Sequence, residues 1–213
     1  MRPSYERQLG MFDPTQYDAD SAHITIAGLG NIGSHTALAL ARMGLRHFAL
    51  YDFDTVEAHN LASQAYSVRD VGKLKVDAIS TQMRALNPAI EIEKRAERYG
   101  GIGGTSILIS AVDNLEARRE MAAHSGAGTF VIDGRMGGGQ IEVHSQYAPD
   151  WAATIPAAAD DDPCGARFIS YTSYLIAGLI ANNVKRHLRG ERVAKRILLH
   201  ADTLQSEIAY ADV

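Results

Sequence analysis

The sequence predicts an α/β fold in which a mostly parallel sheet carries helices on both faces and is extended by antiparallel strands in its C-terminal part. Short apolar strands alternate with helical stretches from residue 23 to residue 133, the order that builds βαβ units. A glycine-rich turn joins the first strand to the first helix. After residue 133 the pattern changes, and residues 140–147 alternate between apolar and polar, as in an antiparallel or half-exposed strand.

The elements are bounded by residues that end helices and by turns. Gly44 stops the first helix, Asn87-Pro88 the second and Gly190 the last, because glycine and proline favour backbone conformations that end a helix. Residues 151–162 are expected to form a loop. In chain order we expect strand 23–28, helix 31–43, strand 47–52, helix 71–86, a strand from 90, strand 105–111, helix 115–123, strands 129–133 and 140–147, helix 168–188, and strands 195–202 and 205–211.

Composition and length indicate one soluble domain. The chain has 213 residues, of which 46% are hydrophobic and 22% charged, and a net charge of −4 argues against nucleic acid as a partner. We expect a single domain over residues 1–213, with an N-terminal arm at about 1–20, a nucleotide-binding part at 21–135 and an extension at 136–213. Neither a secretory leader nor a membrane span is expected, which favours a cytoplasmic protein.

The turn after the first strand has the G-x-G-x-x-G pattern at Gly28, Gly30 and Gly33. The first glycine permits a tight turn, the second lets the backbone approach a phosphate, and the third lets the helix pack closely on the strand. Phosphate oxygens would then face the unpaired amides at the helix N-terminus. The pattern therefore predicts a Rossmann-like nucleotide site, and the alternative is a turn that serves packing alone.

Two acidic residues follow the second strand. Asp52 ends the strand, and Asp54 lies two residues later, on the same face if the extended backbone continues. An acid at this point holds ribose hydroxyls in nucleotide-binding sheets. We expect at least one of the two to do so, and the alternative is that one simply begins a loop.

Several motifs then follow in a fixed order, and together they resemble the ThiF/MoeB/HesA family, relatives of the ubiquitin-activating enzymes. The resemblance is carried over nearly the whole chain up to about Arg135 and more loosely through Cys164. The motifs are Tyr5-Glu6-Arg7-Gln8, the glycine turn, Asp52-Phe53-Asp54-Thr55-Val56-Glu57, Asn60-Leu61, Gln64, Val71-Gly72-Lys73-Leu74-Lys75, and Asp113-Asn114 with Arg118.

The resemblance implies an ATP site and adenylation of a carboxylate, with release of pyrophosphate. The acceptor it implies is the C-terminus of a small ubiquitin-like or sulfur-carrier protein or a peptide. Lys75 matches the family's catalytic lysine, Asp113 its Mg²⁺-binding aspartate, and Arg7 an arginine that reaches the ATP of a neighbouring subunit, which implies a homodimer. The implied nucleotide contacts are Gly28, Gly30, Asn31, Gly33, Asp52, Asp54, Asn60, Gln64 and Lys75.

Each of these residues also has a structural interpretation. Lys75 begins an exposed helix, where a solvated lysine is ordinary, and Arg7 can cover a surface. Asp113 can cap the helix that follows it.

The sequence departs from the family pattern at three points. Ser63 stands where the family commonly has a phosphate-binding arginine, and Arg69 or Arg135 is a candidate replacement. The paired zinc-binding cysteines are absent, so this compact form has no structural zinc, and no separate catalytic-cysteine domain fits in the length. The single cysteine, Cys164, is either a nucleophile that takes the acyl group as a thioester or a small packing residue.

Other functions stay open. An ATP-binding scaffold without catalysis, the inert half of a heterodimer, is favoured by Ser63. An NAD-dependent oxidoreductase is supported only by the glycine turn and Asp52. Adenylation of a small molecule or a modified tRNA base is a further alternative, and the negative net charge disfavours the tRNA substrate.

Overall fold

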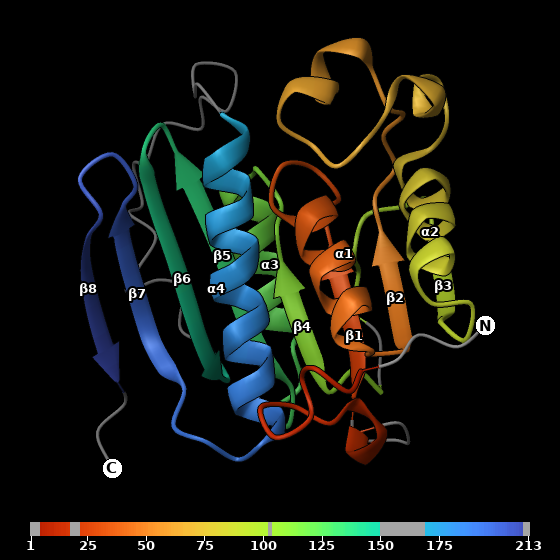
Figure 1. Cartoon of the computed structure of the whole chain (residues 1–213). Coiled ribbons are helices and arrows are strands. Elements are labelled where there is room, and N and C mark those ends of the chain that lie inside the picture. The colour runs from red at the N-terminus through yellow and green to blue at the C-terminus, as the bar shows by residue number, and fades with distance from the viewer. Residues whose placement is uncertain (1–4, 18–21, 102–103, 150–168, 211–213) are drawn as a thin grey trace.

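The structure, a computed structural model, describes residues 5–17, 22–101, 104–149 and 169–210. Its centre is one eight-stranded sheet with strand order β3-β2-β1-β4-β5-β6-β7-β8 (Figure 1). The first five are mutually parallel and the last three join antiparallel, which confirms the expected fold class. The strands are β1 (His23–Ala27), β2 (His47–Tyr51), β3 (Glu91–Arg95), β4 (Ile107–Ser110), β5 (Phe130–Gly137), β6 (Gln140–Tyr147), β7 (Ala194–His200) and β8 (Gln205–Tyr210).

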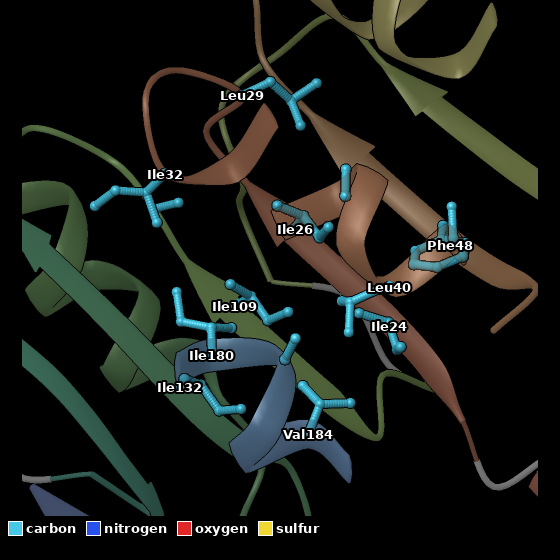
Figure 2. Close-up of a cluster of buried hydrophobic side chains, with 14 of the residues drawn as sticks. Ile24, Ile26, Leu29, Ile32, Leu40, Phe48, Ile109, Ile132, Ile180 and Val184 are labelled. Atoms are coloured by element: carbon cyan, nitrogen blue, oxygen red, sulfur yellow. The ribbon is translucent and has the colours of Figure 1, made fainter. Parts of the chain in front are cut away.

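The helices cover both faces of the sheet. On one face α1 (Gly33–Met43) packs between α2 (Lys75–Leu86) and α4 (Ser170–Leu188). On the other face α3 (Leu115–His124) packs over a smaller cluster built around Tyr51, Leu108 and Val131. Figure 2 shows the larger core, where Ile180 and Val184 of α4 lie over Ile109 and Ile132 of the sheet. No helix in the described ranges has the length and apolarity needed to span a membrane.

Some predicted bounds were wrong. The helix expected at 71–86 begins only at Lys75, because Gly72 has a left-handed backbone (φ 87°) and residues 68–70 form a separate 3₁₀ turn, η3 (Val68–Asp70). The strand expected at 129–133 runs on to Gly137, where Gly138, with φ 58°, turns the chain into β6. The loop expected at 151–162 lies outside the described residues.

The N-terminal arm packs at the amino ends of the parallel strands. Gln8 Nε2 donates to Met43 O, at the end of α1, over 2.7 Å. Asn87 Nδ2, just after α2, donates to Tyr5 Oη over 3.2 Å. Because α1 and α2 run antiparallel to the strands, their C-terminal ends mark the amino edge of the sheet. The arm therefore lies at the opposite edge from the glycine turn (Figure 1).

Candidate active site

The three glycines of the turn are required for different reasons. A Cβ on Gly28, whose φ is 86°, would lie 2.6 Å from Ala111 O, and one on Gly33 would lie 1.8 Å from Gly28 O. The fold therefore needs both glycines. A Cβ on Gly30 would meet only Gln64 Nε2, at 4.0 Å. Packing does not require glycine at position 30, so close approach of a ligand is the physical reason left for it.

Asp52 ties this turn to the segment after β2. Its carboxylate oxygens accept hydrogen bonds from Leu29 N at 2.7 Å and from Asp54 N at 2.8 Å, and the residue is 9% exposed. Burial raises the pKa of Asp52 above its ordinary value, while the nearby Lys75 ammonium and the two amides oppose that shift. A carboxylate has about four acceptor positions, so about two remain beyond the two amide hydrogen bonds.

Lys75 is not a solvated lysine. It is the first residue of α2, is 6% exposed, and places Nζ 2.8 Å from Asp54 Oδ2. The backbone amide of Lys75 also donates to Asp54 O at 2.9 Å. Asp54 therefore accepts hydrogen bonds from both the backbone and the side chain of Lys75. Lys73, two residues earlier, shows the ordinary surface case, since its side chain is 51% exposed and pairs with Asp70.

The segment from Asn60 to Gln64 lies against the glycine turn. Asn60 Oδ1 accepts from Glu57 N at 2.9 Å and so stabilises the 3₁₀ turn η2 (Ala58–Ala62). Ser63 Oγ donates to Asn31 Oδ1 at 2.7 Å, which links this segment to the glycine turn directly. Gln64 Oε1 is buried and accepts no hydrogen bond from any described residue. A buried acceptor without a donor, beside the open face of Gly30, fits a site made for a polar ligand.

Asp113 follows β4 at the same edge of the sheet. The residue is exposed. The cap of α3 is Asn114, whose side chain accepts from Ala117 N at 3.0 Å, so Asp113 does not serve as that cap. No group of three or more His, Cys, Asp or Glu among the described residues could hold a metal alone. Asp113 therefore fits Mg²⁺ only in the way that ion usually binds in nucleotide sites, with one carboxylate, phosphates and water.

The structure does not bring every predicted residue to this edge. Arg7 is exposed on the arm, which packs at the opposite edge of the sheet. Arg69 is exposed in η3, and Arg135 Nε donates to Asp133 Oδ2 at 2.5 Å, so Arg135 is engaged by a buried carboxylate. Cys164 lies outside the described residues.

The sequence did not reveal two buried polar groups near the site. Tyr66 is 7% exposed and donates from Oη to Leu29 O at 2.7 Å, and burial together with Asp52 raises the pKa of its phenol. Arg118 is 5% exposed and pairs with Asp133. Tyr66 is a lone aromatic in a polar segment and carries no periodic signal. Arg118 stood in a motif but without an assigned role.

Comparison with known proteins places these residues in a family context. A profile of the ThiF family matches residues 5–212. The tRNA threonylcarbamoyladenosine dehydratase of Escherichia coli (strain K12) is 30% identical over 156 residues, which are 68% of this chain and 56% of that protein. Ubiquitin-like modifier-activating enzyme 5 of Oryza sativa subsp. japonica is 30% identical over 131 residues, 53% of this chain and 31% of that protein.

Solved structures agree on the fold. E. coli MccB with ATP superposes with a TM-score of 0.77 at 19% identity, over 90% of this chain and 64% of that one. The PaaA structure gives a TM-score of 0.75 at 22% identity, over 90% of this chain and 64% of that one. The chain therefore spans less than two thirds of each of these relatives.

Proposed function

The chain belongs to the ThiF family, and from this premise we propose that it uses ATP and Mg²⁺ to adenylate a carboxylate. The observation that carries the proposal is the buried ammonium of Lys75, fixed 2.8 Å from Asp54 Oδ2 beside the aspartate that holds the glycine turn. A fixed point charge is what a triphosphate needs.

The chemistry follows from charge. A carboxylate oxygen of the acceptor attacks the α-phosphorus of ATP and forms a new P–O bond. The bond between the α-phosphorus and the oxygen that bridges it to the β-phosphorus breaks. Pyrophosphate leaves with that electron pair. Lys75 would stabilise the negative charge on the phosphate oxygens, and the open backbone at Gly30 admits them. Mg²⁺, when bound through Asp113, would supply additional positive charge to the phosphates.

We propose a protein or peptide C-terminus as the acceptor. One curated relative is named as a ubiquitin-like modifier-activating enzyme, and MccB has been solved together with MccA. A second candidate acceptor is a carboxylate on a modified tRNA nucleoside, because another relative is named a tRNA threonylcarbamoyladenosine dehydratase. The net charge of −4 favours the protein acceptor, since tRNA binding relies on positive surface charge.

We further propose a homodimer with composite sites. Arg7 is exposed on the arm, which packs on the ends of α1 and α2 at the amino edge, whereas the glycine turn of its own sheet lies at the other edge. Supplied by a second copy, it would offset the charge lost where Ser63 replaces the family's arginine. Ser63 also supports the scaffold alternative, in which ATP binds without reaction.

Calorimetry separates the nucleotide assignments. Mg·ATP should bind and raise the melting temperature by mass action, whereas NAD should do neither. Tight binding of NAD without binding of ATP would overturn the proposal. Binding of ATP with no exchange of labelled pyrophosphate into ATP for either acceptor class would instead identify a scaffold.

Cys164 has a test of its own. If it forms a thioester, Cys164→Ala should keep pyrophosphate exchange and lose a covalent, thiol-labile adduct with the acceptor. An adduct that survives the substitution would return Cys164 to a packing role.

A further inference from the structure

Arg118 is a buried arginine that touches two separate segments of the chain. It lies on α3, is 5% exposed, and donates through Nη1 to Asp133 Oδ1 and to Gly134 O, the latter at 2.9 Å. Through Nη2 it donates to Val112 O. One rigid guanidinium therefore joins the middle of β5 to the turn that leads out of β4.

The pairing is more than a way to fill space. Asp133 is fully buried and is held by Arg118 on Oδ1 and by Arg135 on Oδ2. Removing such charges from water is unfavourable, and apolar residues of similar size usually pack as well or better. A buried pair that also fixes a backbone carbonyl outside its own strand points to a positional role.

The turn that Arg118 holds carries Asp113. On the N-terminal side of Asp113, Ala111 N donates to Ala27 O at 2.8 Å, and Val112 O accepts a hydrogen bond from Arg118. After it, Asn114 caps α3, and its carbonyl accepts from Arg118 N at 3.2 Å. Asp113 is thus an exposed carboxylate between two residues whose backbone carbonyls are hydrogen-bonded. Arg118 donates to both of these carbonyls, Val112 O and Asn114 O.

We infer that Arg118 is a positioning residue, which presents the Asp113 carboxylate to the metal–triphosphate complex. This inference rests on the proposed function, because it assigns Asp113 a metal. Lysine at 118 would keep a charge for Asp133 but offers no planar fork to reach Val112 O as well. The expected loss is therefore specific to the metal-dependent part of binding.

The test compares ATP affinity in Mg²⁺ with ATP affinity in EDTA by calorimetry. Wild type should bind more tightly with Mg²⁺, Asp113→Ala should lose that gain, and Arg118→Lys should reduce it by about tenfold to a hundredfold. Affinity in EDTA should stay unchanged. In the Asp113→Ala background, Arg118→Lys should have no further effect, since contacts that act through one group are not additive. Arg119→Lys, on the next residue of α3, is the matched control.

A second readout needs no ligand. Hydrogen exchange of the amides at residues 111–115 in the free protein should speed up in Arg118→Lys and not in Arg119→Lys. Asp133→Asn leaves the backbone acceptors of Arg118 in place and should speed up the exchange of these amides less than Arg118→Lys does. It replaces Arg118→Lys in the test if the lysine variant folds poorly.

The outcomes separate the two ideas. A wild type that does not bind ATP defeats the proposed function. A wild type that gains affinity from Mg²⁺, with Arg118→Lys keeping the full gain or weakening ATP equally in EDTA, overturns the positioning role alone. A wild type that binds ATP without any gain from Mg²⁺ also overturns it.

Discussion

The two edges of the parallel sheet are built differently. At the carboxyl edge, Asp52 and Lys75 are 9% and 6% exposed, and each is held by short hydrogen bonds to neighbouring segments. At the amino edge, the arm lies on the ends of α1 and α2 and presents Arg7 to solvent. Burying ionisable groups is unfavourable, and the buried residues Asp52 and Lys75 therefore mark the carboxyl edge as the candidate active site among the described residues. The amino edge presents an exposed arginine, which our proposal assigns to the site of a second copy.

The largest expected effect is at the carboxyl edge. Lys75→Ala and Asp113→Ala should each slow pyrophosphate exchange by about a hundredfold to a thousandfold, because each removes about 3 kcal/mol of stabilisation of transition-state charge. Lys73→Ala, whose side chain is 51% exposed, is the matched control and should stay near wild type. Equal losses of pyrophosphate exchange in the Lys73 and Lys75 variants would contradict a specific catalytic role for the buried lysine.

The amino edge is tested by complementation. Arg7→Ala and Asp113→Ala should each be inactive as pure dimers, while a mixed dimer keeps one site with both residues intact. Random mixing should therefore restore exchange toward about a quarter of wild type, given a symmetric dimer. Absence of recovery despite proven subunit exchange, or a monomer at working concentration, would contradict a site shared between the two edges.

Two glycines of the turn at the carboxyl edge, Gly30 and Gly33, are expected to differ in what their replacement by alanine affects. Gly30→Ala should lower ATP affinity by about tenfold while leaving stability within about 0.5 kcal/mol, because its Cβ enters open space beside Gln64. Gly33→Ala places Cβ 1.8 Å from Gly28 O and should unfold or strongly destabilise the protein. Calorimetry and denaturant midpoints measure both. Unchanged ATP affinity in Gly30→Ala would show that no phosphate approaches there.

How far the sequence predicts this contrast depends on the kind of residue. The glycine turn and Asp52 could be predicted because backbone constraint and position after a strand are local signals, whereas Lys75 and Asp113 were predicted from their place in the ordered family motifs. The sequence did not show that Lys75 is buried, since burial depends on Asp54 reaching it across a turn. The role proposed for Arg118 depends on its contacts with both β5 and the turn after β4; the βαβ order predicts the two strands but not the side chain that joins them.

The smallest expected effect is on pH dependence. His35 is 8% exposed beneath the Ser63 segment, and burial lowers its pKa below the ordinary 6.5. Below that ordinary value the unfolded chain binds a proton that the folded chain resists, so stability should fall as pH drops from 7 toward 5, by less than about 1.4 kcal/mol per pH unit. Denaturant midpoints should show a shallower slope in His35→Gln; an unchanged slope would contradict the assignment.

Adenylation is tested most directly by following oxygen atoms. An acceptor whose C-terminal carboxylate carries ¹⁸O should be incubated with the protein, ATP and Mg²⁺, and the acyl group then passed to a nucleophile such as hydroxylamine. Because a carboxylate oxygen becomes the bridge to the α-phosphorus, attack at the acyl carbon should release AMP that contains ¹⁸O, with pyrophosphate in equal amount. Unlabelled AMP, or ADP and phosphate as the products, would contradict carboxylate adenylation.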